Sequence, residues 1–213
     1  MEQNVKVADA SVNRMGAFNW SHVAFAACAA AAIVLPFVAQ NFLIFQLTMA
    51  IIYAIAILGL TLLTGFCGQF SLGHGAFYAI GAYTAAILMG QAGFGYYAAI
   101  PIAGFVCLLA GLLFALPALR LQGIYLALAT FALAIAVPQL LRWKPLAPWT
   151  GGVQGVSIDK PDAPFGLPIN SDQWFYFVTL AIAALLYLFA INLMRSRSGR
   201  AILSIRENPI AAR

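Results

Sequence analysis

Apolar residues occupy the chain in long uninterrupted blocks. No Asp, Glu, Lys or Arg occurs from Met15 to Leu119. One membrane-spanning helix needs about 20 consecutive apolar residues, so this uncharged stretch has room for four such helices with short connections. The pattern therefore predicts a protein whose first half crosses a lipid bilayer several times.

We expect about six membrane-spanning segments, separated by polar residues, glycines or prolines. Pro117 is expected to mark the end of the fourth and Pro138 to bend or end the fifth, because proline removes a backbone hydrogen bond from a helix. A signal peptide is an alternative for the first, but its apolar run is longer than the ~7–15 residues of a signal core. The six segments cover approximately residues 21–40, 42–63, 66–89, 97–116, 121–141 and 174–194.

The third segment opens unusually. Four of the eleven residues in the range 65–75 are glycines, and glycine weakens a helix. We expect a broken or re-entrant start here, followed by a regular helix from about Ala76. Non-helical backbone at membrane depth is tolerated only where it packs within protein or lines a wet cavity. If the segment enters and leaves by the same face, the two chain ends lie on opposite sides of the membrane.

The expected fold class is all-α: a polytopic transmembrane helical bundle of about six spans, with one broken or re-entrant Gly-rich segment. We divide the chain into a cytoplasmic N-terminal segment (1–20), a transmembrane region (21–194) and a cytoplasmic C-terminal segment (195–213). A polar external loop at about 143–173 contains many prolines and glycines. Trp143 and Trp174 flank it, as tryptophans do at a membrane interface.

Composition and charge support this assignment. Hydrophobic residues make up 63% of the chain and charged residues only 8%, against roughly 25% charged in soluble domains. Lys and Arg concentrate in cytoplasmic loops. With six spans both ends share one side, which holds eight cations against three, so we expect both termini in the cytoplasm and the chain in the plasma (inner) membrane. The eight are Lys6, Arg14, Arg120, Arg195, Arg197, Arg200, Arg206 and Arg213, and the three are Arg142, Lys144 and Lys160. The net charge of +5 therefore needs no nucleic acid as partner.

The chain lacks the residues that the common enzyme mechanisms require. None of the three lysines follows a glycine, so the lysine of a phosphate-binding P-loop is missing and we expect no ATP hydrolysis by the chain itself. No Asp or Glu lies in the first four spans, and His22 and His74 stand apart, which argues against a catalytic triad and a metal site. Cys28, Cys67 and Cys107 are widely spaced in apolar stretches and are expected to be small buried side chains. We expect no cofactor and no metal.

With enzyme chemistry excluded on these grounds, the remaining roles for the apolar segments are helix packing and passage of a solute. Small residues recur at four-residue spacing between residues 71 and 79, which lets helix backbones approach closely in lipid. Such faces serve packing alone or surround a translocation path. For a path, the candidate polar and aromatic residues are Gln46, Gln69, Ser71, His74 and Tyr78.

Two of these candidates have competing interpretations. An ionisable group in a membrane segment is a functional-site hypothesis by default, so His74 is a candidate for substrate contact or gating. It also lies between two glycines, where a neutral histidine bonded to freed backbone carbonyls is the alternative. Tyr78 is a candidate for lining a path, or a packing residue with one satisfied hydroxyl.

The C-terminal segment combines arginines with apolar residues. Ala201, Ile202 and Ile205 recur at helical spacing beside basic residues. This predicts a short amphipathic helix just inside the membrane, which Pro209 ends or follows with a second short turn. Composition and spacing leave three roles open: a positive anchor that fixes topology, a helix on anionic lipid, or a docking site for a protein partner.

Three motifs follow one another along the chain: GLTLLTGFCGQFSLGHGAFYAIGAY (59–83), LRLQGIYLALAT (119–130) and TGGVQG (150–155). Together they resemble the signature of branched-chain amino acid ABC transporter permeases. The tail SGRAILSIRENPIAA (198–212) is similar to the cytoplasmic loop by which such permeases meet their ATPase. The resemblance covers most of residues 42–213.

The resemblance implies an importer that works by alternating access. Two cytoplasmic ABC ATPase subunits hydrolyse the ATP, a second permease subunit completes the path, and an extracytoplasmic substrate-binding protein delivers a branched-chain or related amino acid. Urea, amides and aromatic acids are alternative solutes. By the same resemblance, the ATPase-coupling residues are Gly199, Arg200, Ala201, Ile205, Arg206, Glu207 and Ala211. Pro209 departs from many such permeases and is expected to shorten the coupling helix.

Length is a further departure, because such permeases continue past this loop with more hydrophobic spans. We therefore expect a fragment or truncated product that does not transport by itself, and a non-transporting remnant or assembly subunit is an alternative. A secondary transporter, driven by an ion gradient, is a further alternative. It would be expected to carry ionisable residues within its spans, and the first four contain only His74, apart from His22 at the first boundary.

Overall fold

The computed structural model describes residues 30–121, 123–158 and 169–207. Within these ranges the chain is helical and contains no strand, which confirms the all-α fold class. The long helices are α3 (Asn41–Thr61), α4 (His74–Gly90), α5 (Tyr96–Ala118), α6 (Ile124–Leu141) and α8 (Ser171–Arg195). The short elements are the π-helix η1 (Leu62–Phe66), η2 (Lys144–Leu146), α7 (Ala147–Thr150) and α9 (Arg197–Glu207), and residues 30–38 are also helical.

Four of the described helical segments are long and apolar enough to cross a membrane. They are Asn41–Phe66, Tyr96–Ala118, Ile124–Leu141 and Ser171–Arg195. Helix α4 is shorter, with 17 residues and a length of ~26 Å, because the Gly-rich residues before it are not helical. Residues 1–29, which include much of the expected first span, lie outside the described residues. A total of six spans therefore stays a prediction.

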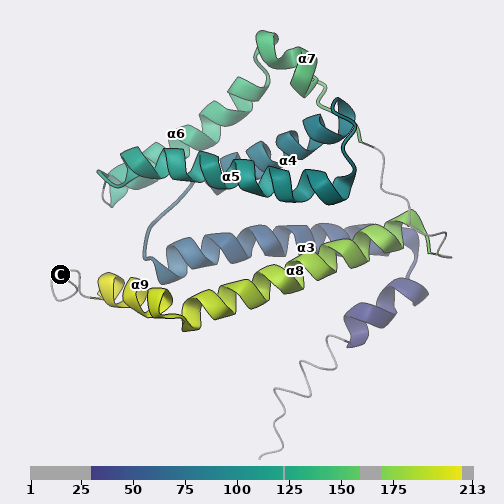
Figure 1. Cartoon of the computed structure of the whole chain (residues 1–213), viewed down its shortest axis with the longest axis horizontal. Helices are drawn as coiled ribbons and strands as arrows, with labels where there is room; N and C mark the ends of the chain where they lie inside the picture. The colour runs from purple at the N-terminus through teal and green to yellow at the C-terminus, as the bar shows by residue number, and fades with distance from the viewer. Residues whose placement is uncertain (1–29, 122, 159–168, 208–213) are drawn as a thin grey trace, which may run out of the picture.

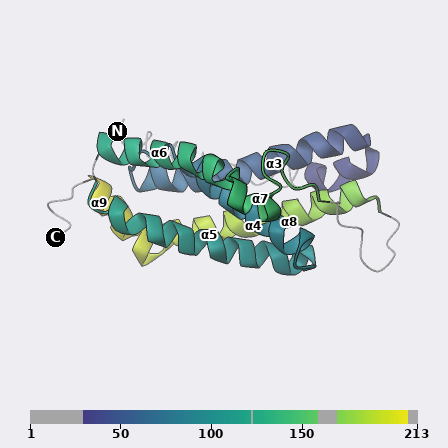
Figure 2. The same ribbon diagram turned by 90° about the horizontal axis from the view of Figure 1, so that it is seen from above.

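The long helices form two groups (Figure 1). In one, α3 packs along α8; in the other, α4 packs along α5 and contacts α6. In the view from above, the axes of the long helices of both groups are roughly aligned (Figure 2). Because successive helices alternate in direction, η1, the start of α6 and α9 gather at one end of the bundle, which we call the α9 end.

Helix α4 lies close to α5 at a glycine, Gly81. A Cβ on Gly81 would lie 3.0 Å from the sulfur of Cys107, and the Cys107 thiol donates to the carbonyl of Phe77 at 3.4 Å. The ring of Phe77 meets that of Phe114 edge-on, with centroids 6.1 Å apart. Gly75, one of the expected small packing residues, has no neighbour within 4 Å of an added Cβ. The contact of α4 with Cys107 thus lies about 1.7 turns further along α4 than Gly75.

One hydrogen bond links the two groups at the end opposite α9. The indole N–H of Trp174 on α8 donates to the hydroxyl of Tyr96 on α5 at 2.8 Å. Helix α8 starts earlier than expected because Asn170 and Gln173 form a capping box, which satisfies backbone N–H groups of the first turn. The expected interfacial tryptophan is therefore also a link between helix groups.

The prolines expected to end helices lie within their last turns. Helix α5 continues one residue past Pro117, and α6 continues past Pro138 to Leu141. Each proline lacks the N–H that would bond the carbonyl four residues earlier, so each removes one backbone bond near the end of its helix. The expected ends were therefore correct to within a turn.

Large apolar side chains cover the outside of the described bundle. Phe105, Leu113 and Leu119 are exposed, whereas small residues such as Ala76 and Ala99 are buried. Contiguous exposed apolar surface of this kind marks contact with lipid or with other subunits. In a bilayer the tight contacts between helices are made by small residues, as they are here.

Candidate functional site

The chain leaves the helical conformation between η1 and α4, over residues 67–73, which we call the broken segment. It begins at a π turn, in which the amide of Cys67 donates to the carbonyl of Leu62 at 3.2 Å. Such turns are rare and often lie at functional sites. Gly68 follows with φ 67°, a left-handed conformation that glycine adopts readily. Helix α4 then starts at His74, two residues before the expected position, and the expected break is confirmed.

Helix α6 holds the far end of the broken segment. The amide of Leu72 donates to the hydroxyl of Thr130 at 3.0 Å, and that hydroxyl donates to the carbonyl of Ala127 at 2.9 Å. A Cβ on Gly73 would lie only 2.7 Å from the carbonyl oxygen of Thr130. Thr130 is about two turns into α6 and is buried. The far end of the break is therefore packed against α6, whereas Gly68, Gln69, Phe70 and Leu72 are exposed in the described chain. Non-helical backbone at membrane depth needs packing of this kind or a wet cavity.

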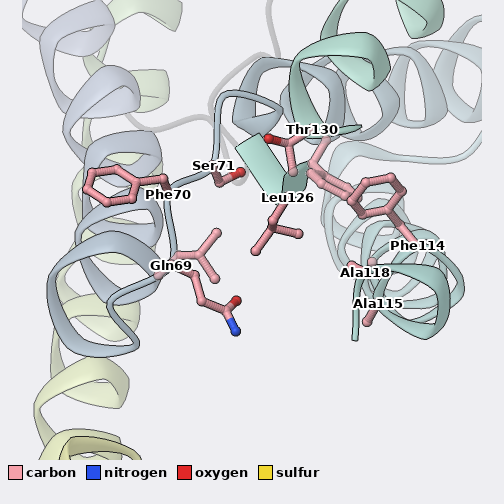
Figure 3. A pocket seen from close by; sticks show the side chains of 11 residues that line it. Gln69, Phe70, Ser71, Phe114, Ala115, Ala118, Leu126 and Thr130 are labelled. Carbon is pink, nitrogen blue, oxygen red and sulfur yellow. The ribbon is translucent and has the colours of Figure 1, made fainter. Parts of the chain in front are cut away.

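A cavity of about 230 Å³ opens beside the broken segment (Figure 3). In Figure 3 the side chain of Ser71 points toward Leu126, and that of Gln69 extends into the space between the broken segment and Ala115 and Ala118 of α5. The helices of the α4–α5–α6 group supply most of the opposite walls. The lining residues are Leu63, Gln69, Phe70, Ser71, Phe77, Gly111, Phe114, Ala115, Ala118, Leu126 and Thr130.

The side chains that line the cavity determine which solutes it can bind and which reactions it can support. It contains an amide and two hydroxyls among apolar and aromatic side chains, and none of its residues is charged. The hydroxyl of Thr130 is already engaged in the backbone contacts of the break, so Gln69 and Ser71 are the polar groups available to a solute. The volume is below the roughly 300 Å³ at which pockets for drug-sized molecules begin. The cavity therefore suits binding of a small, partly apolar solute and offers no general acid, base or nucleophile.

The structure brings two of the five predicted path residues together. Gln69 and Ser71 line the cavity, whereas Gln46, His74 and Tyr78 are not among its lining residues. Gln46 is exposed near the start of α3, and Tyr78 is 49% exposed on α4. The imidazole of His74 lies over Gly59 of α3, where an added Cβ would meet Cε1 at 3.0 Å.

Sequence reasoning did not select Thr130, Phe114 or Ala118 as parts of a site. A signal for Thr130 existed, because it is the only Ser or Thr between Ile124 and Leu141. Gly111 and Ala115 carry the small-residue spacing that predicts close packing, but here they leave room for the cavity instead. Among the described residues, no group of three His, Cys, Asp or Glu is placed to hold a metal ion.

The predicted amphipathic helix is α9, which joins α8 through a sharp elbow. The hydroxyl of Ser196 donates to the carbonyl of Leu193 at 2.6 Å and accepts from the amide of Gly199 at 3.2 Å. Gly199 is buried, and a Cβ there would overlap the carbonyl oxygens of Leu193 and Met194. Its place in the coupling motif therefore has a steric reason within the chain.

The sides of α9 differ in what they contact. Ile202 faces Leu62, Phe66 and other residues around a cavity of about 50 Å³ under the helix. Arg206 donates from Nη1 to the carbonyl of Gly65 in η1. The remaining coupling candidates Arg200, Ala201 and Ile205 are exposed. Glu207 is the last residue of α9, and Ala211 lies outside the described residues.

Comparison with known proteins places these features in a family. A family model described as "Branched-chain amino acid transport system / permease component" matches residues 42–213. The chain is 36% identical over 206 aligned positions to the high-affinity branched-chain amino acid transport system permease protein LivM of Salmonella typhimurium and to that of Escherichia coli. Each alignment covers 85% of this chain and 48% of the relative, so the chain spans about half the length of these curated relatives. No solved structure matches.

The matched range contains the broken segment, the cavity beside it and helix α9. It covers most of the chain and, except for Asn41, contains all of the four long apolar helices. The chain belongs to the family of permease components of branched-chain amino acid transport systems.

Proposed function

We propose that the chain forms the membrane path of an ATP-driven importer for branched-chain or related amino acids, working by alternating access. The observation that carries the proposal is the uncharged cavity at the broken segment, which Gln69 and Ser71 line. An apolar amino acid has a side chain that suits the aromatic walls and polar ends that suit an amide and a hydroxyl. The LivM relatives, named as branched-chain amino acid permeases, support the same class of solute.

The division into two helix groups supports alternating access. The α3–α8 pair and the α4–α5–α6 group each pack internally, and α3 makes little contact with α4. Bodies of this kind can rock against each other around a site between them. The ATPases would drive this motion only if they bind its two states with different affinity.

The partners are two cytoplasmic ABC ATPase subunits, a second permease subunit and an extracytoplasmic substrate-binding protein. In this arrangement the ATPases dock on the exposed side of α9, where Ala201 and Ile205 are apolar and Arg200 is charged. ATP is hydrolysed by those partners and not by this chain.

Charge supports an orientation with the α9 end in the cytoplasm. Arg120 and the four arginines from Arg195 to Arg206 lie at this end, while Arg142 and Lys144 follow the opposite end of α6. Excess Lys and Arg mark cytoplasmic loops. Both termini then lie in the cytoplasm of a multi-pass inner-membrane protein.

Uptake tests the cavity directly. In cells that hold the partner subunits, Gln69→Met with Ser71→Ala should reduce uptake of labelled leucine at least about tenfold, because a site built to pair polar groups loses strongly when they are removed. Gln46→Met, an exposed position outside the cavity, is the matched control. Uptake that survives the double substitution would remove the cavity from the path.

The same assay distinguishes the solutes. Unlabelled leucine should compete with the label, and urea, acetamide and benzoate should not. Uptake of labelled benzoate or acetamide in parallel assays, with no uptake of labelled leucine, would assign an aromatic acid or an amide instead. No uptake from any variant, with the chain inserted and partners present, would favour a non-transporting remnant.

Co-purification tests the docking surface. Ile205 is 55% exposed on α9, so Ile205→Asp should place a charge in the ATPase interface and lower recovery of the ATPase with the tagged chain. The control is Val153→Asp, which adds the same charge at an 86% exposed residue after α7. Equal recovery from both variants contradicts docking on this side of α9.

A further inference from the structure

One arginine of α9 points back into the chain. The guanidinium of Arg206 donates to the carbonyl of Gly65, in the π-helix that precedes the broken segment. Its aliphatic stem lies on Gly68, where an added Cβ would come within 3.0 Å of Cγ. The side chain therefore contacts both sides of the point where the helix breaks. Gln69 follows Gly68 directly and is the first residue of the broken segment that lines the cavity.

The contact is chemically suited to hold a helix end. The last carbonyls of a helix lack partners within it and carry partial negative charge. A guanidinium supplies several N–H donors in a fixed plane. Gly68 allows the approach because it has no side chain and because its φ of 67° is one that glycine tolerates.

We propose that Arg206 is a positioning residue that couples α9 to the cavity. A displacement of α9 by the ATPases moves the Gly65–Gly68 corner and with it Gln69 and Ser71, so the cavity responds to the state of the ATPase. This inference rests on the proposed function. It also changes the role of Arg206, from an ATPase contact to a link inside the chain, and leaves docking to the exposed residues of α9.

Arg200 offers a matched comparison on the same helix. It is exposed like Arg206, but its guanidinium bonds to the carbonyl of Arg195 in the α8–α9 elbow at 3.2 Å. Replacing either arginine by alanine removes one positive charge and one long side chain from α9. Only the Arg206 variant removes a contact with η1.

The link is testable on the chain alone in lipid nanodiscs. Ser71→Cys, in a background with Cys28, Cys67 and Cys107 replaced by alanine, reports the position of the broken segment through its rate of alkylation by a water-soluble maleimide. Arg206→Ala should raise this rate about fivefold, which converts to ~1 kcal/mol, while Arg200→Ala should change it less than about twofold, as a surface substitution does. Arg206→Lys, which keeps one donor, should restore part of the protection.

Two results would overturn the link. One is an alkylation rate that is unchanged by Arg206→Ala, with the protein monodisperse by size exclusion. The other is an equal increase from Arg206→Ala and Arg200→Ala, which would assign the effect to lost charge. If Arg206→Ala lowers the melting temperature so far that folding is in doubt, Gly68→Ala gives a second perturbation of the same contact and should also raise the rate; no increase there likewise overturns the link.

The assembled importer separates this inference from the proposed function. Arg206→Ala should lower leucine uptake at least about fivefold while ATPase recovery stays within about twofold of the unaltered chain. Loss of ATPase recovery with Arg206→Ala and unchanged alkylation would make Arg206 a docking contact and reject the link. Failure of the unaltered chain to recover any ATPase would overturn the proposed function, whereas the alkylation rates judge the link by themselves.

Discussion

The hydroxyl of Thr130 on α6 accepts a hydrogen bond from the backbone amide of Leu72, 58 residues earlier in the chain, at 3.0 Å. The bond satisfies a backbone donor that the break in helix removes from the usual pairing. Within a bilayer an unpaired amide costs several kcal/mol. One buried hydroxyl on a neighbouring helix thus stabilises the non-helical segment that lines the cavity.

Thr130→Val should lower the free energy of unfolding by ~1–2 kcal/mol, because valine keeps the shape but leaves the Leu72 amide without its partner. Thermal unfolding in detergent, followed by circular dichroism, measures the change. Thr84→Val is the control, since the Thr84 hydroxyl bonds only to the carbonyl of Ile80 in its own helix, at 2.7 Å. Equal loss from both variants would show that the long-range bond contributes nothing of its own.

Gly73→Ala should destabilise the chain by ~1–3 kcal/mol, a range typical of forcing atoms into a packed site. The added Cβ would lie 2.7 Å from the carbonyl oxygen of Thr130. The backbone there is fixed by the bond of the Leu72 amide to Thr130 and by that of the Ala76 amide to the carbonyl of Gly73. Gly75→Ala, two residues on, has open space around its Cβ and lies in helix, where alanine is favoured by ~0.5–1 kcal/mol. Melting temperatures should therefore shift in opposite directions, and a shared direction contradicts the close approach of residue 73 to α6.

The apolar blocks were enough to predict the long helices. The expected span 97–116 is found as Tyr96–Ala118, and 174–194 as Ser171–Arg195. Span length follows from composition, because every backbone group in lipid must be paired within the helix. The start of α8 was missed by three residues although Asn170 and Gln173 carry a capping signal in the sequence.

The site was less accessible to prediction, because these helices are apolar on all sides. With no polar stripe, periodicity does not say which helices pair or which face a cavity. Gln69 and Ser71 could be selected since they are polar residues at a break, but the α5 and α6 walls depend on contacts between distant segments. Arg206 was predicted only as an ATPase contact; its bond to Gly65 joins residues 141 apart in the chain.

Gly199→Ala should open the elbow between α8 and α9, because its Cβ would overlap the carbonyl oxygens of Leu193 and Met194. The chain would then be cleaved faster by trypsin after the arginines of the elbow, and limited proteolysis with mass spectrometry measures the rate. Ser198→Ala, at the exposed neighbouring residue, controls for any effect on α9 itself. Cleavage rates that match between the two variants would mean that the elbow does not require glycine.

Ala115→Leu should block the cavity while leaving the bundle stable. Ala115 lines the cavity, so the three additional carbons of leucine can occupy empty space instead of displacing packed atoms, and filling a void is neutral or mildly stabilising. Leucine uptake should fall at least about tenfold in cells that hold the partner subunits, with the melting temperature of the purified chain unchanged or raised. Ala132→Leu makes the same change at an exposed residue of α6 and should leave both measurements near those of the unaltered chain. A stable Ala115→Leu chain that still supports full uptake would show that the solute passes elsewhere, because a path through the cavity has no room for both the leucine side chain and the solute.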